Sequence, residues 1–122
     1  MIIDLEKLNP VRLPIEVAVS AITMAELAAG PHAATDADER ALRQDRLQRA
    51  EAAFDPLPFD SEASRAYGRI YAAVAASGRK ARGARVADLL IAATACSLGL
   101  PLYTRNPADF RALRGLVDVI AV

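Results

Sequence analysis

One stretch, Ala84 to Ala95, constrains the fold of this sequence more than any other. After Asp88 it reads Leu-Leu-Ile-Ala-Ala, and these apolar residues point in every direction around a helix. A helix that is apolar all round is packed on every side, which predicts a buried helix here. Asp88 lies in its predicted first turn, where unpaired N–H groups and the positive end of the dipole keep a carboxylate ionised. Asp88 is therefore either a charge match for the helix start or a functional acid, and the helix argument alone favours the first.

Composition limits the class of protein. With 122 residues, 53% of them hydrophobic, residues 1–122 form one domain with a workable core. No apolar run reaches the roughly 18 residues that span a bilayer, and Met1-Ile2-Ile3-Asp4 is no signal peptide. We therefore expect a cytoplasmic protein with no membrane partner, and a buried Cys96 in a reducing compartment. The net charge of zero argues against a protein that coats nucleic acid through bulk charge.

Hydrophobic periodicity and helix-breaking residues predict alternating helices and strands. The expected elements are a helix over 2–8, a strand over 17–20, a helix over 22–29 that Gly30-Pro31 stops, a charged helix over 36–53, a helix from Asp60 or Ser61 to Gly78, the buried helix, a strand at Leu102-Tyr103, a helix that Asn106-Pro107 opens, and a strand over 116–122. This order implies an α/β sandwich with a mostly parallel sheet.

Several polar residues follow the predicted strands. Glu26 is the only charged residue of the apolar stretch 17–31, where a carboxylate needs water, a partner or a metal. In parallel sheets the functional crevice lies at the carboxyl ends of the strands, where the next helices begin. We therefore expect four side chains to converge there: Glu26, Asp88, Asn106 and Asp109.

The donor atoms of this set indicate a hard metal ion. Oxygen ligands without a His or Cys cluster fit Mg²⁺, or alternatively Mn²⁺. Carboxylate-held Mg²⁺ is a usual apparatus for cutting phosphodiesters. The run Arg79 to Arg85 carries four positive charges in seven residues. Such a run is usually a solvated loop, but beside an acidic pocket Arg82 and Arg85 become candidate contacts to a phosphate backbone.

Three segments together resemble the successive motifs of PIN-domain ribonucleases, and most closely those of the VapC toxins of type II toxin–antitoxin systems: Val17–Leu27, Val86–Ala95 and Tyr103–Phe110. The resemblance runs from about residue 2 to the end of the chain. It implies an α/β PIN-like fold, magnesium-dependent RNA cleavage, a cognate VapB-like antitoxin and a homodimer.

The resemblance also implies roles for individual residues. By position, Glu26 and Asp88 are metal-site acids, and Asp109 completes the acidic cluster. Asn106 is a polar neighbour of the cluster. Thr104 orients the group and is a candidate substrate contact.

The N-terminus departs from the family pattern. VapC proteins begin with a strand that ends in Asp-Thr-Ser, whereas Met1 to Leu8 looks like the helix that follows it. We therefore favour the hypothesis that the first strand and its aspartate would lie upstream of Met1. In the alternative, Met1-Ile2-Ile3 is an abbreviated first strand and Asp4 is the metal ligand.

Two functions remain open at this stage. The first is a metal-dependent endoribonuclease toxin, in which Asp4 completes the ligand set or a longer protein supplies the aspartate. The second is an inactive remnant that binds antitoxin or RNA without cleaving it. The RNA sequence that is cut cannot be predicted from these motifs.

Overall fold

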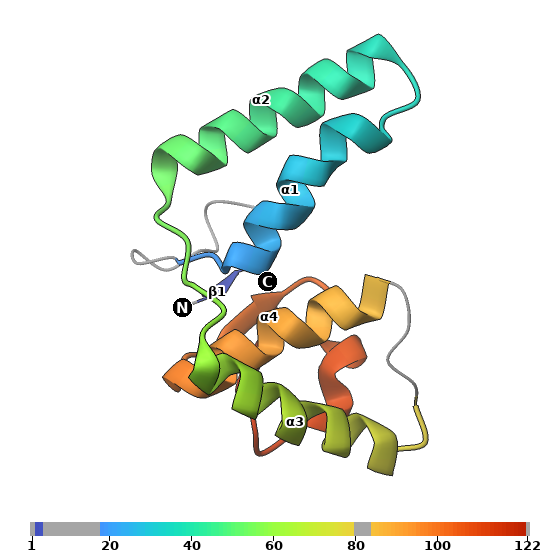
Figure 1. The fold of residues 1–122 in the computed structure, drawn as a ribbon. Helices are drawn as coiled ribbons and strands as arrows, with labels where there is room; N and C mark the ends of the chain where they lie inside the picture. Colours follow the sequence, from blue (N-terminus) through green and yellow to red (C-terminus); the bar gives the residue numbers. More distant parts are fainter. Residues whose placement is uncertain (1, 4–17, 80–83, 122) are drawn as a thin grey trace.

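The computed structural model describes residues 2–3, 18–79 and 84–121 and has an α/β architecture (Figure 1). The elements follow in the order β1 (Ile2–Ile3), α1 (Ala21–Ala33), α2 (Ala37–Ala53), α3 (Ser61–Ala76), α4 (Ala84–Leu98), β2 (Leu102–Thr104), the 3₁₀ helix η2 (Pro107–Leu113) and β3 (Val119–Ala121). None of the helices in these ranges is long and apolar enough to cross a membrane.

The described strands form one parallel sheet in the order β1-β2-β3. Leu102 of β2 pairs with Ile2 on one side and with Val119 on the other. The prediction of an α/β fold with a parallel sheet is confirmed. The expected strand over 17–20 is reduced to bridges, one of which joins Ser20 to Leu57 in parallel.

Strand β1 corrects the prediction for the N-terminus. Ile2 and Ile3 do not form a helix but pair with Leu102 and Tyr103 of β2. Isoleucine is β-branched and favours the extended backbone, and here the backbone finds a partner strand. The sheet position beside β2 that the favoured hypothesis left empty is therefore filled by an abbreviated strand. Asp4 lies outside the described residues.

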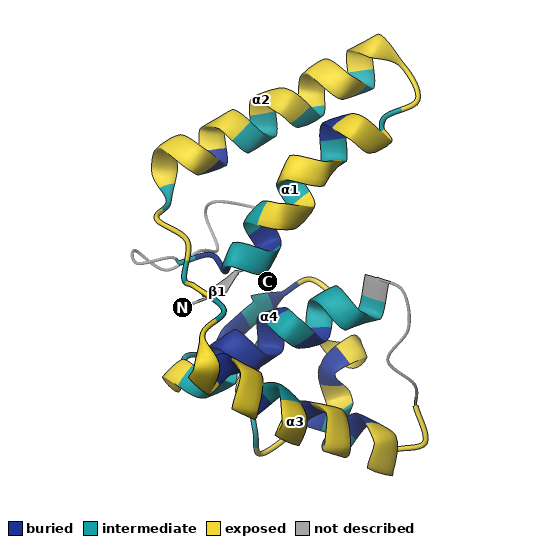
Figure 2. Cartoon of the chain, in the orientation of Figure 1, coloured by how far each residue is buried: buried dark blue, intermediate teal, exposed yellow. Residues whose placement is uncertain are grey.

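Helix α4 is the centre of the core, as its sequence predicts. It contributes five buried apolar residues, and α3 packs along it (Figure 2): Leu89, Ile91, Ala92, Ala93 and Ala95. Leu102 of β2 and Leu113 of η2 complete the same cluster. Cys96, expected to be buried, is half-buried at the edge of this core, with Arg69 Nη2 3.8 Å from its sulfur.

Helices α1 and α2 pack side by side as a hairpin (Figure 1). Helix α1 continues through Gly30-Pro31, so the predicted stop is wrong. A proline inside a helix normally costs stability because it lacks an N–H group and crowds the preceding turn. Here α2 supplies donors to the end of α1: Arg43 Nη1 lies 2.9 Å from the Gly30 carbonyl oxygen, and Arg40 Nε lies 3.4 Å from that of Pro31.

Candidate active site

The carboxyl end of β2 holds two of the predicted site residues in one tight turn. Thr104 is the last residue of β2 and is only 2% exposed. Its Oγ1 accepts a hydrogen bond of 3.1 Å from the backbone N–H of Asn106. Asn106 is exposed and precedes η2 without capping it through its side chain. Thr104 Oγ1 thus fixes the backbone of the turn that carries Asn106. The predicted roles of Thr104 in orienting the site and in contacting substrate stay predictions.

The first turn of α4 lies against the start of η2. Arg85 donates from Nη2 to the backbone carbonyl of Asp109. Arg85 Nε is buried and has no hydrogen-bond partner. Because one end of this guanidinium is fixed on η2, Arg85 joins two elements that both begin at the carboxyl edge of the sheet. Its role as a substrate contact stays a prediction.

Asp88 follows Arg85 by three residues on α4 and is half-buried. Leu89, the next residue, is 1% exposed, so the core fixes the backbone that carries the carboxylate. The side chain of Asp88 is not isolated, because it interacts with another group. Asp88 thus lies near the start of α4, as the sequence predicted, and its role in a metal site stays a prediction.

Glu26 lies on a different element, helix α1. Helix α1 begins at the buried Ser20, whose Oγ accepts a hydrogen bond of 3.0 Å from the Thr23 N–H and so caps the helix. Glu26 lies in the second turn, is exposed and also interacts with another group. Since α1 packs on α4, the two helices that carry Glu26 and Asp88 are neighbours.

The predicted three-carboxylate cluster is not found. Within the described ranges, no three His, Cys, Asp or Glu residues lie close enough to hold a metal ion together. Glu26, Asp88 and Asp109 therefore do not form one metal-binding group. At Asp109, the backbone carbonyl accepts the hydrogen bond from Arg85 of α4.

The expected ion does not require three protein carboxylates. Mg²⁺ keeps several waters and is usually held through only one or two protein carboxylates. Glu26 and Asp88, on packed neighbouring helices, supply donors of that kind. Asp4 and Arg82 lie outside the described residues, so their predicted roles are not tested here.

The sequence feature that best indicated the candidate site is the occurrence of single acidic residues within apolar stretches of the sequence. The capping of α1 by Ser20 and Thr23 was missed, although a serine three residues before a polar residue at a helix start indicates such a cap.

Comparisons with known proteins identify the family of this chain. Residues 5–116 match the family model described as PIN domain. The chain is 39% identical over 113 residues to Ribonuclease VapC5 of Mycobacterium tuberculosis (strain ATCC 25618 / H37Rv), an alignment that covers 93% of this chain and 80% of the relative.

Solved structures give the same result. The chain superposes on VapBC-5 from Mycobacterium tuberculosis, a member of the VapBC family of toxin-antitoxin systems, with a TM-score of 0.85 and 37% sequence identity. The match covers 99% of this chain and 97% of the other. It matches FitAcB from Neisseria gonorrhoeae with a TM-score of 0.68 and 32% identity, over 85% and 73% of the two chains. The chain therefore belongs to the PIN-domain family and, within it, to the VapC proteins.

Thr104 allows a direct test of how the turn after β2 is held. Replacing Thr104 with Val keeps the shape of the side chain but leaves the Asn106 N–H without its acceptor. We expect a loss of about 0.5–1.5 kcal/mol in the free energy of unfolding, measured by urea denaturation, because water can reach the exposed Asn106. Thr104→Ser keeps the acceptor and loses only a buried methyl group, which gives the cost of packing at this position. Wild-type stability of Thr104→Val would contradict a role for the hydroxyl.

Proposed function

We propose that this protein is a magnesium-dependent endoribonuclease, the toxin of a toxin–antitoxin pair, that cuts RNA phosphodiesters. The membership of the VapC proteins and the identity to a protein named a ribonuclease support the reaction class. The observation that carries the proposal is the position of Asp88 near the start of α4, a helix that contacts η2 through Arg85 and packs on α1.

The residues of this chain have distinct tasks in the proposed reaction. Asp88 and Glu26 hold the cation through their carboxylates. When bound, Mg²⁺ lowers the pKa of a coordinated water and neutralises charge on the scissile phosphate. Thr104 fixes the turn that carries Asn106, whose exposed amide is available to a ligand at the end of β2. Arg82 and Arg85, before Asp88 in the sequence, are the proposed cationic neighbours of the RNA backbone.

The fold of the N-terminus favours an active enzyme over an inactive remnant. Asp4 follows β1 directly in the sequence, and β1 lies beside β2 in the parallel sheet. An aspartate after such a strand is the ligand that the alternative hypothesis for the N-terminus requires. We therefore propose Asp4 as a further metal ligand, in place of an aspartate upstream of Met1.

The proposed partners are a VapB-like antitoxin, an RNA substrate and a second copy of the chain. The solved relative VapBC-5 is described as a toxin-antitoxin family member, which supports an antitoxin as the regulator. The proposed location is the cytoplasm, where both the RNA and the antitoxin would be met.

An assay of metal dependence tests the proposal. Purified protein is incubated with a labelled structured RNA in Mg²⁺, in Mn²⁺ and in excess EDTA, alone and with Asp4→Asn. We expect cleavage in either metal, none in EDTA, and a large loss of cleavage for Asp4→Asn. Cleavage of equal rate in EDTA would rule out the metal-dependent mechanism. An unchanged rate for Asp4→Asn would mean that Asp4 is not a metal ligand and that another residue has this role.

A further inference from the structure

The 3₁₀ helix η2 sorts its residues into columns. A 3₁₀ helix has three residues per turn, so side chains at i and i+3 lie on the same side. Phe110 and Leu113 make one column and are buried at 7% and 0% exposure. Arg111 makes the next column, and Arg114 follows three residues later at the end of the helix. Both arginines are exposed.

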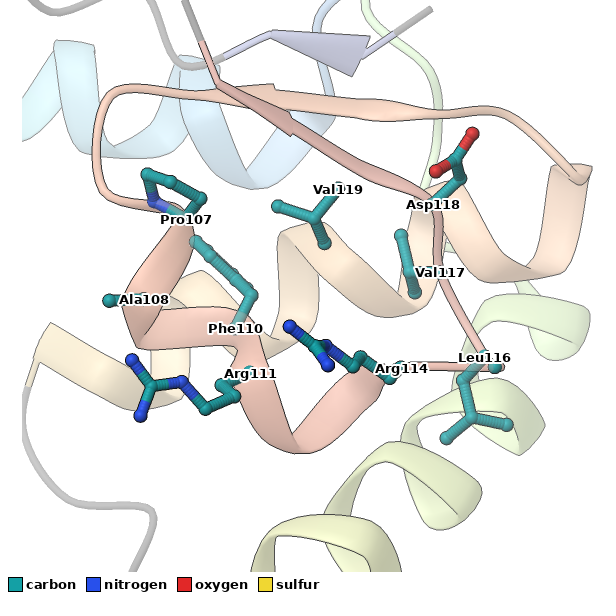
Figure 3. A pocket seen from close by; sticks show the side chains of 10 residues that line it. Pro107, Ala108, Phe110, Arg111, Arg114, Leu116, Val117, Asp118 and Val119 are labelled. Atoms are coloured by element: carbon teal, nitrogen blue, oxygen red, sulfur yellow. The ribbon is translucent and has the colours of Figure 1, made fainter.

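This arginine column borders an open hollow between η2 and the segment that leads into β3. The hollow has a volume of about 730 Å³, and the described residues that line it are 107–108, 110–111 and 114–119. Figure 3 shows Arg114 extending along the hollow and Arg111 on its rim. The buried side chains of Phe110 and Val117 give it an apolar floor.

The positive charges of Arg111 and Arg114 are not neutralised by acidic residues that line the hollow. Neither Arg111 nor Arg114 forms an ion pair with any residue in the described ranges. Asp118 is the one acid among the described lining residues, and Figure 3 shows its carboxylate pointing away from Arg114. Two cations three residues apart on a helical turn repel each other, so the pair adds nothing to stability by itself. An anion between them would remove that repulsion.

We propose that this hollow, defined by Arg111, Arg114 and the floor of Phe110 and Val117, binds a nucleotide of single-stranded RNA that flanks the scissile phosphate. The two guanidiniums hold a backbone phosphate, for which their planar forks are suited. The base lies on the apolar floor. This inference rests on the proposed function, but it concerns binding rather than cleavage.

The position of the hollow on η2 connects it to the candidate active site. Asp109, at the start of η2, accepts a hydrogen bond from Arg85 of α4, one turn before Asp88. Arg114 follows Asp109 by five residues, which at about 2 Å per residue corresponds to roughly 10 Å along the helix. One RNA strand can therefore touch both places, which favours RNA over an unrelated acidic ligand.

Binding measured without cleavage tests the hollow separately from the catalytic site. A fluorescent single-stranded RNA is titrated in EDTA with the wild type and with Arg111→Ala/Arg114→Ala, over a range of salt concentrations, and the RNA is checked to be intact. Each phosphate contact that is lost lowers the slope of log K against log salt by about 0.7 for single strands, and the two arginines share one phosphate, so we expect a slope reduced by about 0.7. The same slopes, taken from a 1 M reference, correspond to roughly 5-fold weaker binding at 0.1 M salt.

The control removes the same charge elsewhere. Arg49 and Arg65 have side chains 81% and 64% exposed, on α2 and α3, so Arg49→Ala/Arg65→Ala should keep the wild-type slope. Arg111→Lys/Arg114→Lys keeps both charges and should recover most of the slope, and thermal melts check that every variant is folded.

Equal slopes for the two alanine pairs would overturn the proposal that the hollow binds RNA, while leaving the proposal of metal-dependent cleavage untouched. A wild type that binds no RNA would overturn both proposals. Competition by polyglutamate at the concentration at which unlabelled RNA competes would reassign the hollow to an acidic peptide.

Discussion

Asp88→Asn is expected to abolish magnesium-dependent RNA cleavage while the protein stays folded. The substitution keeps the shape of the side chain and removes the charge that holds the cation. Loss of a residue that merely supports a metal ligand typically costs 10–100-fold in metal affinity or activity, so loss of the ligand itself should cost at least about 100-fold. The rate of cleavage at saturating Mg²⁺, measured by gel, gives the effect directly.

The folded state of this variant is checked separately from its activity. Asparagine keeps the size of the side chain and can still form hydrogen bonds, so the variant should fold. Thermal melts without metal are expected to give a cooperative transition, and antitoxin binding should persist. Asp55→Asn, the same change at an exposed position of the loop before α3, is the matched control and should cleave normally. Cleavage by Asp88→Asn at the wild-type rate would mean that this region is not the active site.

The elements that the sequence predicted well are those with a single strong cause. Helix α4 is apolar in every direction, and no other arrangement in a small domain buries such a segment, so its place in the core followed from its residues. Asp36 and Asp60 cap α2 and α3 because a side-chain oxygen at that position satisfies a free N–H, which is a local effect.

The elements that it predicted poorly depend on partners far away in the chain. Ile2 and Ile3 become a strand because β2, a hundred residues later, offers backbone hydrogen bonds, and no local pattern reveals that. Helix α1 continues past Pro31 to Ala33, and Arg40 and Arg43 of α2 donate to the Pro31 and Gly30 carbonyls at its end, which is a contact between helices that local sequence does not reveal. Both errors arise from tertiary contacts that override local preference.

The candidate site shows the same division. Single acids in apolar stretches pointed to Glu26 and Asp88, and the folded chain places them on neighbouring helices. Asp109 was grouped with them because it starts a helix after a strand, yet that rule does not specify which atom faces the neighbour. The sequence did not predict the arginine column of η2, because its apolar positions 107, 110 and 113 repeat every three residues, as in a 3₁₀ helix, and not with the 3.6-residue period of an α-helix.

Leu89→Ala is expected to have the largest effect on stability. Leu89 is 1% exposed at the centre of the core, and truncation of a buried leucine to alanine typically costs 2–5 kcal/mol because it leaves a cavity. That is a large part of the roughly 5–15 kcal/mol that stabilises a domain of this size. Urea denaturation should show a much lower midpoint with an unchanged slope.

Leu98→Ala is the control that the same helix provides. Leu98 is 49% exposed at the end of α4, so the same truncation there should change the free energy of unfolding by no more than about 0.5 kcal/mol. Comparing the two variants separates the cost of the cavity from the change in helix propensity, which is the same in both. Because Leu89 follows Asp88 directly, its variant also tests whether the core positions the acid. The rate of cleavage is measured under conditions in which the variant is fully folded. If the core only stabilises the fold, this rate equals that of the wild type. A lower rate shows that packing at Leu89 sets the position of the Asp88 carboxylate.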